Sequence, residues 1–543
     1  MKKLNIIITT FITAGLLSSC NKQLNVKNPN NPTPQSASTE KGIISLAQGS
    51  IYTDGFTSNG VKYYDGVMGA FFAGVNGFHS IMGDEVDDEA ANEYMNQIGC
   101  PYSVTLEDGT VIINNQAPQK QPDLIRQVNQ NSYSYNNPLY YEWAYMYNLN
   151  NSANYILSLV DNITFGGDAD TKKNTLKAWA YWWKGYAYSR IGSMYYAGII
   201  NNTPAATNNK YVTKEDIITE ANANFDKAAT ILGGLSNNST YSTLLGQLIP
   251  SIFQVGKGLP PTPDMWVRNI NTYKARNILA NTTVASMSAA QWSQVLTLTN
   301  NGIKADDDVF TARSNANSDF ISFTSGTVAS KAVGDPASLA AYIIQERLVE
   351  DFKTGDLRFK NNFQALDAPY TYPDRGIALG TRWMLLDGGN GISGTAIFGS
   401  RSIGDYELFM ACSYEENELM KAEAKIYTGD ITGGLSLIDE VRTYQGAGLA
   451  PVAGTTQDAA TAKEELRKER RIGLMFRGLA FYDARRWEVI TNGRKNAWFV
   501  DNSGKFHPSV TINYDYLDYW DVPDNELAYN APSSDSAPVK NPK

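Results

Sequence analysis

Residues 469–487 read ERRIGLMFRGLAFYDARRW, and the interpretation of the 543-residue chain starts from this stretch. Its charges recur at helical spacing, with Glu469 and Arg470 at one end and Asp483 and Arg486 at the other. Long helices bring side chains three or four residues apart together, and arginine contacts carboxylates through two parallel hydrogen bonds. A catalytic use of these acids is the alternative. The pattern favours ion pairs that hold a helix to its neighbours.

Helical patterns extend from this stretch toward the N-terminus. In one of them Trp179 and Trp183 continue a three-and-four spacing from Leu176, which predicts a helix. Tyr181 and Trp182 make the same segment apolar on nearly all sides, so we expect it to have neighbours on several sides. Thr213 is the expected N-cap of the next helix. The predicted helical regions are 140–160, 171–197, 213–232, 271–280, 289–303, 415–427, 435–441 and 459–490.

These helices form antiparallel pairs with short turns, such as the glycine-rich turn at 429–434. The pairs resemble tetratricopeptide-type hairpins, although the full repeat consensus is absent. Segments rich in Pro, Gly and Asn separate them and are too long to be mere connections. The predicted fold is therefore mainly α, with a helix-pair scaffold at 140–305 and 405–495 and an irregular, loop-rich binding lobe. Small strands are expected at Thr110–Asn114 and Trp383–Leu386. The separating segments are 201–210, 235–263, 310–336, 365–403 and 496–543.

Composition excludes several classes of protein. Hydrophobic residues make up 43% of the chain, which is ample for a large core and excludes full-length disorder. The formal net charge of −9 argues against a nucleic-acid partner. Two histidines make a histidine-rich metal site impossible, and three cysteines exclude a disulfide scaffold. Cys100 and Cys412 are either a disulfide pair or two small buried residues.

The first twenty residues predict an exported lipoprotein. Lys2 and Lys3 precede the apolar stretch Leu4–Leu17, which has the length of a signal peptide. It ends on Leu-Ser-Ser-Cys, so Cys20 is the expected lipidation site, with a plain secretory signal and a chance cysteine as the alternative. We expect a signal peptide at 1–19, a lipidated cysteine and flexible tether at 20–40, and a single body at 41–543.

The stretch 469–487 also resembles the signature of the SusD/RagB family of surface lipoproteins. Further landmarks of that family follow the same order as in this chain, at 349–358, 414–427, 438–442 and 520–530. Gly473, Arg477, Ala480 and Ala484 depart from the family pattern and weaken its ion pairs without removing them. The matching signature positions are Glu469, Arg470, Leu474, Phe476, Gly478, Asp483, Arg486 and Trp487.

The resemblance implies a non-enzymatic protein, anchored to the outer membrane by lipid and facing the cell exterior. Such proteins cap a SusC-like TonB-dependent transporter and pass it a bound nutrient, most often a polysaccharide or oligosaccharide and sometimes a peptide. In such lipoproteins an acidic run often follows the lipidated cysteine, but no acidic run follows Cys20 in this chain. No cofactor is implied.

Candidate ligand contacts follow from what a sugar requires, namely aromatic faces for its C–H groups and polar groups for its hydroxyls. Tryptophans at helical spacing are expected in the core, whereas aromatics in loops are better candidates. The acidic segment 84–89 has two alternative interpretations besides ligand contact. It could bind calcium, or it could be a solvated helix N-terminus. The predicted ligand-binding residues are Trp266, Trp383, Tyr372, Phe78, Tyr94, Asp84 and Arg382.

Two other classes of function stay open. A secreted glycoside hydrolase would need two carboxylates about 5–10 Å apart, and the sequence has 55 acidic residues but no local catalytic motif. A structural lid without a ligand of its own would require the loop aromatics to be buried.

Overall fold

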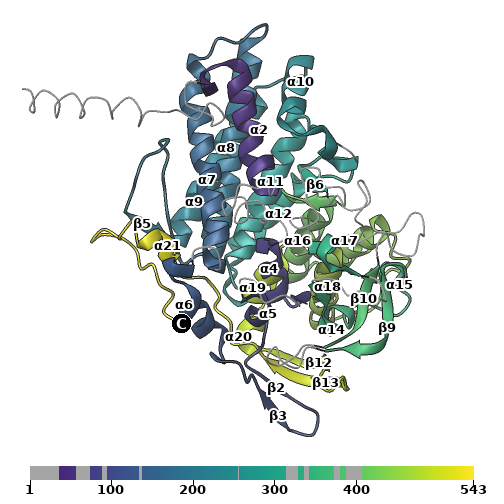
Figure 1. Cartoon of the computed structure of the whole chain (residues 1–543). Helices are drawn as coiled ribbons and strands as arrows, with labels where there is room; N and C mark the ends of the chain where they lie inside the picture. The colour runs from purple at the N-terminus through teal and green to yellow at the C-terminus, as the bar shows by residue number, and fades with distance from the viewer. Residues whose placement is uncertain are drawn as a thin grey trace, which may run out of the picture.

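Helix α8 (Ala169–Met194) is the longest helix of the described residues and runs through the centre of the scaffold (Figure 1). The computed structural model describes residues 36–56, 74–88, 94–133, 137–254, 256–313, 328–334, 342–371, 380–386 and 407–543. Asp168 caps α8 by accepting a hydrogen bond of 3.1 Å from the backbone N–H of Thr171. From Thr175 onward nearly every side chain of α8 is buried, which confirms the prediction of neighbours on several sides.

The scaffold is a row of antiparallel helices in which each packs against the next. Helix α8 lies between α7 (Pro138–Leu159) and α9 (Lys214–Gly233), and α9 packs on α11 (Pro263–Ala280). Helix α12 (Ala289–Asn300) then contacts both α11 and the pair that ends the row. That pair is α16 (Tyr414–Tyr427) and α17 (Ile431–Tyr444), joined by a turn in which Gly429 has a φ of 97°. The mainly α, helix-pair architecture is confirmed.

The C-terminal helical region is broken, which corrects the expectation of one region over 459–490. Helix α18 (Ala459–Gly473) ends before a turn in which Phe476 and Gly478 have φ angles of 62° and 69°. Two short helices follow the turn, α19 (Ala480–Arg486) and α20 (Val489–Asn492). Left-handed backbone cannot continue a helix, so the turn folds α19 back onto other elements.

The other helices are short or lie at the rim of the scaffold. Helix α10 (Ser239–Leu248) lies inside a segment that was predicted to be irregular. Of the expected tether at 20–40, the structure describes residues 36–40. These residues include η1 (Ser36–Ser38) and the first residue of α2 (Glu40–Phe56), so this end of the expected tether is largely helical. Among the described residues, no helix is both long and apolar enough to cross a membrane. The remaining helices are α4 (Asn76–Met82), α5 (Met95–Ile98), α6 (Gln121–Val128), α13 (Val328–Ala332), α14 (Glu346–Val349), α15 (Leu357–Asn362) and α21 (Asp524–Leu527).

Small sheets join segments that are far apart in sequence. The largest described sheet has the strand order β12-β13-β2-β3, so a C-terminal hairpin pairs with residues near position 104. Both predicted strands are confirmed, as β3 (Val111–Ile113) and β10 (Thr381–Leu386). The other strands are β1 (Val86–Asp88), β2 (Ser103–Thr105), β4 (Ala197–Ile199), β5 (Tyr211–Thr213), β6 (Thr311–Arg313), β7 (Val333–Gly334), β8 (Tyr342–Ile344), β9 (Phe363–Tyr370), β11 (Glu407–Phe409), β12 (Arg494–Val500) and β13 (Phe506–Asn513).

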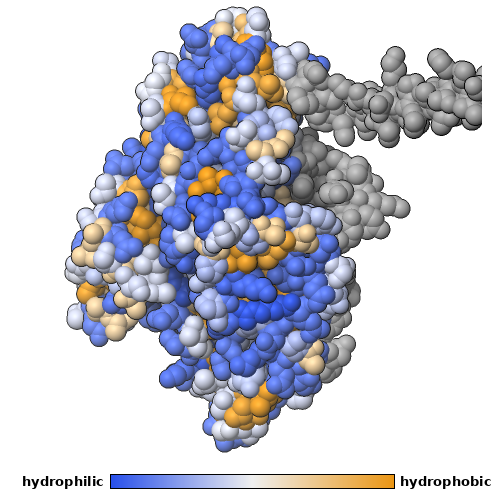
Figure 2. All heavy atoms as spheres, turned by 90° about the vertical axis from the view of Figure 1, so that its left-hand side faces the viewer, coloured by the Kyte–Doolittle hydropathy of each residue, from blue (hydrophilic) through white to orange (hydrophobic). Residues whose placement is uncertain are grey.

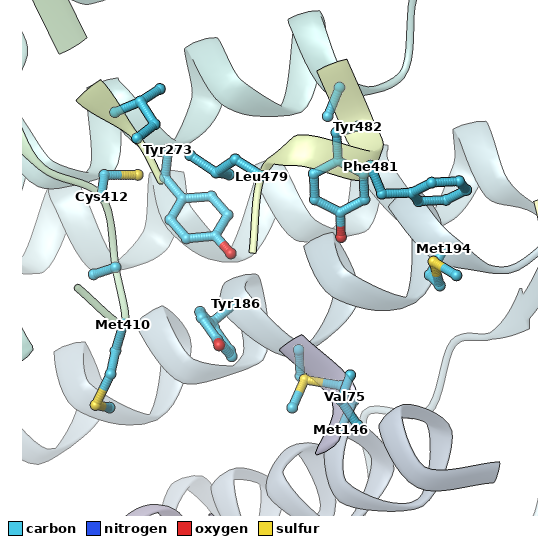
Figure 3. Packing of buried hydrophobic residues seen from close by; sticks show 14 of the residues in the cluster. Val75, Met146, Tyr186, Met194, Tyr273, Met410, Cys412, Leu479, Phe481 and Tyr482 are labelled. Carbon is cyan, nitrogen blue, oxygen red and sulfur yellow. The ribbon is translucent and has the colours of Figure 1, made fainter. Parts of the chain in front are cut away.

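A large core connects the scaffold with the smaller elements, and a second, smaller cluster of buried residues lies between α11, α12 and α16. Figure 3 shows Tyr186 of α8, Tyr273 of α11 and Tyr482 of α19 directed toward a common centre. The predicted core tryptophans of α8 are all buried there. Cys100 and Cys412 are buried and are not joined by a disulfide, so the alternative of two small buried residues is confirmed. Burial raises the pKa of both thiols.

Candidate functional site

Trp266 is not available to a ligand, which corrects its predicted role. It lies in the first turn of α11 rather than in a loop, and its side chain is 0% exposed. Its ring makes edge contacts with Trp179 and Phe310, at centroid distances of 6.2 and 5.2 Å. The proline-rich loop before it positions the N-cap of the helix, and the ring completes the tryptophan cluster of the core.

Phe78 and Asp84 are also buried, which corrects their predicted ligand contacts. Phe78 lies in α4 and stacks on Tyr141 at 6.3 Å. Asp84 binds Arg347 at 2.8 Å and Arg494 at 3.0 Å. Burial acts to raise the pKa of Asp84, but the two guanidinium groups overcome it and lower the pKa to about 2. Both oxygens of Asp84 are thus committed to arginines, and neither is free for calcium or a sugar.

Of the other predicted contacts, Arg382 and Trp383 are neighbours on β10, with the guanidinium 5.9 Å from the centre of the Trp383 ring. Arg382 binds Glu346 at 2.7 Å, and its guanidinium lies 3.4 Å from the ring centre of Phe506. Trp383 packs edge-on against Phe359 at 5.0 Å. Tyr94 is half-buried before α5. The ligand contacts of Arg382, Trp383 and Tyr94 stay predictions. Tyr372 and Cys20 lie outside the described residues.

An open pocket of about 770 Å³ lies at the side of the scaffold, where α7, the β4–β5 connection and α21 meet. Figure 1 places α21 and β5 at the left edge of the molecule, and Figure 2 turns that predominantly hydrophilic side toward the viewer. A volume of this size is typical of ligand sites. We call it the asparagine pocket. Its lining residues are Tyr147, Asn150, Asn151, Asn154, Ile199, Asn201, Ala205, Ala206, Thr207, Asn208, Asn209, Glu526, Tyr529 and Asn530.

One face of α7 forms the floor of the asparagine pocket. Tyr147, Asn150, Asn151 and Asn154 lie at steps of three, one and three residues, so the helix presents them on the same side. Two of these amides hold the opposite wall, because Asn150 and Asn154 both donate to the carbonyl of Asn201 at 2.9 Å. The floor therefore also fixes the conformation of the β4–β5 connection.

The wall formed by residues 200–210 is held by the same kind of bond. Asn151 Oδ1 accepts from the backbone N–H of Ala205 at 2.8 Å, and Asn208 Nδ2 donates to the carbonyl of Ile200 at 2.8 Å. These bonds leave exposed side chains on the pocket side. Thr207 and Asn209 are exposed, and neither side chain makes a hydrogen bond within the described part of the chain.

The third wall comes from the C-terminal end of the chain. Asn530 Nδ2 donates to Glu526 Oε1 at 2.8 Å and to the carbonyl of Asn208 at 2.9 Å, which joins α21 to the β4–β5 connection. Glu526 Oε2 accepts from the indole of Trp143 at 3.2 Å. Tyr529 next to them is 82% exposed. The face of this ring is therefore open to a ligand at the edge of the pocket.

The arrangement suits a ligand with many hydroxyl groups. Side-chain amides both donate and accept hydrogen bonds, as sugar hydroxyls do, and the Tyr529 ring offers a face to C–H groups. None of these residues is among the predicted ligand contacts, which are loop aromatics with charged neighbours. The available signal was the density of asparagine at 148–154 and 201–209, the second of which lies in a segment expected to contribute to a site.

Comparisons with known proteins connect this architecture to one family. Residues 416–543 match the model of the SusD family. No curated protein matches the chain. A SusD superfamily protein from Parabacteroides distasonis has a TM-score of 0.53 at 12% identity, over 90% of this chain and 97% of that one. A putative sugar binding protein from Bacteroides vulgatus has a TM-score of 0.52 at 15% identity, over 90% and 95%.

A third solved structure, described as holding a xylogluco-oligosaccharide, has a TM-score of 0.55 at 13% identity and covers 92% of this chain and 99% of that one. Identities this low show a shared fold. Together with the match over residues 416–543, they confirm the predicted resemblance to the SusD/RagB family.

Proposed function

We propose that this chain, which matches the SusD family over residues 416–543 and has a SusD-like fold, binds a nutrient glycan at the cell surface. It then delivers the glycan to a SusC-like, TonB-dependent outer-membrane transporter. The chain is held at the membrane by lipid on Cys20, with residues 1–19 removed. Acyl chains on this cysteine would each contribute about 0.8 kcal/mol per buried CH₂ group.

The asparagine pocket is the observation that carries this proposal. It combines the exposed ring of Tyr529 with an asparagine-rich lining in which the side chain of Asn209 is exposed and makes no hydrogen bond within the described residues. Sugars bind such surfaces through C–H contacts and paired hydrogen bonds. Two of the similar structures are described as a putative sugar binding protein and as a complex with a xylogluco-oligosaccharide, which supports a glycan as the ligand class.

Capture without cleavage fits the chemistry of the pocket. Glycoside hydrolysis uses two carboxylates about 5–10 Å apart on either side of the scissile bond. Glu526 is the one acidic residue among those that line the asparagine pocket, and both its oxygens already accept hydrogen bonds. A single, committed carboxylate supplies neither the acid nor the nucleophile of that reaction.

Two alternatives share the same fold. A structural lid without its own ligand agrees with the burial of Trp266 and Phe78, but it does not account for the exposed ring of Tyr529. A peptide-binding lid would also use amide groups, which pair with a peptide backbone. The aromatic ring and the density of side-chain amides favour a glycan over both.

The test uses residues 21–543, purified without lipid. Plant, host and microbial polysaccharides and a peptide pool are screened by affinity electrophoresis and calorimetry, with product analysis of each mixture. We expect binding to one glycan class without cleavage, and at least tenfold weaker binding by the Tyr529→Ala variant. Tyr444→Ala removes another exposed tyrosine, on α17, and is the matched control. Cleavage products, or peptide binding alone, would contradict the proposal.

A further inference from the structure

The asparagine pocket is lined by one acidic side chain and by no basic one. No lysine, arginine or histidine is among its lining residues, and Glu526 is the one ionisable carboxylate there. Amide, hydroxyl, aromatic and aliphatic groups make up the rest. A pocket that binds an anionic ligand normally supplies a cation or several backbone N–H groups to replace the water around the charge.

The carboxylate of Glu526 is fixed in place by two neutral hydrogen-bond donors. Trp143 Nε1 and Asn530 Nδ2 hold its two oxygens, at 3.2 and 2.8 Å. Within the described residues Glu526 forms no ion pair. Both of its hydrogen-bond partners are neutral, so they orient the negative charge without cancelling it.

Two cations beside the pocket, Lys184 and Lys210, already have polar partners. Lys184 lies under the pocket floor, where its ammonium donates to Asn154 and, at 2.8 Å, to Asn202 Oδ1. Its side chain is buried, so it does not reach a ligand. Burial also lowers the pKa of Lys184 to about 8, which reduces its charge in mildly alkaline solution. Lys210, beside Asn209, pairs with Asp535 at 2.8 Å.

We propose that the asparagine pocket selects uncharged saccharides, and that the fixed carboxylate of Glu526 excludes saccharides that carry carboxylate or sulfate groups. This inference rests on the proposed function, since it specifies the class of glycan that the same site takes. An acidic sugar entering the pocket would lose part of its hydration and meet a like charge in a partly dehydrated space. A neutral sugar meets only groups that match its hydroxyls.

The test compares each acidic polysaccharide with its own carboxyl-reduced form. Polygalacturonate, glucuronoxylan and hyaluronan are each reduced, so that backbone and linkage are kept while each carboxylate becomes a neutral hydroxymethyl group. The full mature chain is assayed by affinity electrophoresis and calorimetry at low and high salt. In any pair that binds, we expect the reduced form to bind at least tenfold more tightly at low salt. The ratio of the two affinities should move toward one at high salt, because salt screens the repulsion between the acidic sugar and Glu526.

The Glu526→Gln variant tests the residue itself. It removes the charge while keeping the size of the side chain, and we expect the ratio between reduced and acidic forms to fall toward one. Glu464→Gln makes the same charge change on α18, at a site outside the pocket, and should leave the ratio unaltered. Melting temperatures of both variants report whether the fold is intact.

The outcomes separate the two proposals. If neutral or reduced glycans bind and the acidic forms bind equally well, the exclusion of charge is overturned while glycan capture stands. If acidic forms bind more tightly than their reduced forms, the exclusion is likewise overturned. If no glycan of either kind binds and only basic peptides do, both the proposed function and this inference fall.

Discussion

The indole Nε1 of Trp143 donates a hydrogen bond of 3.2 Å to Oε2 of Glu526, across 383 residues of sequence. This contact joins α7, which forms the floor of the asparagine pocket, to α21, which forms one of its walls. The same carboxylate accepts from Asn530, which in turn holds the β4–β5 connection. Three separate segments of the chain therefore meet through one side chain.

Replacing Trp143 with Phe should loosen this wall. The change removes the donor to Glu526, and a net loss of about 1 kcal/mol in the free energy of unfolding is expected from the bond alone. We expect glycan affinity to fall roughly threefold to tenfold by calorimetry, because the carboxylate and Tyr529 lose their anchor. Trp487→Phe removes a comparable indole–carboxylate contact, to Glu423, outside the pocket and is the control. Equal effects of the two variants on affinity would contradict this account.

Replacing Trp266 with Ala should unfold the core rather than remove a ligand contact. Truncation of a fully buried tryptophan costs about 3–5 kcal/mol of the free energy of unfolding. Denaturant titration measures that loss, and calorimetry under native conditions measures the affinity of the folded fraction, which should stay unchanged. Trp266→Phe should lose less stability. A variant with normal stability and no binding would restore the ligand role that the structure removed.

Glu85 should make the protein less stable as the pH rises toward neutral. Burial raises the pKa of Glu85 to about 7, above the ordinary value of 4.5. Between these two pH values the folded state holds a proton that the unfolded state releases. The contribution is therefore fully present below pH 4.5 and is lost as the pH rises through 7, by an amount of the order of 3 kcal/mol. Denaturant titrations from pH 4.5 to 8 check this dependence.

The Glu85→Gln variant should flatten part of that dependence and be more stable than the parent chain at pH 8. Glu350, whose pKa burial also raises to about 7, should account for a further part, which the double variant removes. Asp84 serves as the internal contrast, because a pKa of about 2 places its titration outside this range. A slope unchanged by both glutamine substitutions would contradict the assignment.

Glu469 should be needed for folding rather than for binding. It is fully buried and binds Arg358 at 2.6 Å and Arg442 at 2.7 Å. Removal of the shared carboxylate in Glu469→Ala leaves two buried guanidinium groups without it, at a cost of about 3–5 kcal/mol. Solubility, circular dichroism and denaturant titration measure the loss. Glu464→Ala, on the exposed side of the same helix, should change stability by less than about 1 kcal/mol. Normal stability with altered ligand binding would instead favour a role in the site.

Cys20 should decide whether the chain is anchored. Cys20→Ser is expected to release the protein from the membrane fraction and to abolish labelling by a radioactive fatty acid. Cys100→Ser, at a buried thiol, should keep both properties as long as the chain folds. Retention of Cys20→Ser in membranes without lipid would point to another anchor.

Most helices could be predicted from the sequence because a helix leaves a local, periodic record. The aromatic spacing around Trp179 and the N-cap at Thr213 each predict a helix from a few neighbouring residues, and both are confirmed. The break after Gly473 was missed because Phe476, rather than a glycine alone, adopts the left-handed backbone. Arg470 and Asp483 form a bidentate pair across this turn.

The site could not be predicted in the same way. Trp266 followed a stiff polar loop and was expected in solvent, yet it is covered by Trp179 and Phe310 from other parts of the chain. Tyr529 lies within the family landmark at 520–530, but nothing in its sequence neighbourhood predicts that its ring is 82% exposed. Whether an aromatic side chain is buried depends on which segments pack over it, and sequence spacing carries little information about that.

The sequence by itself determined the fold class, the expected lipid anchor and the family resemblance, because each rests on residues close together or on motifs in a set order. The tertiary structure alone decided where a ligand has room. The asparagine pocket draws on residues 147–154, 199–209 and 526–530, and it exists only because long-range hydrogen bonds bring these segments together.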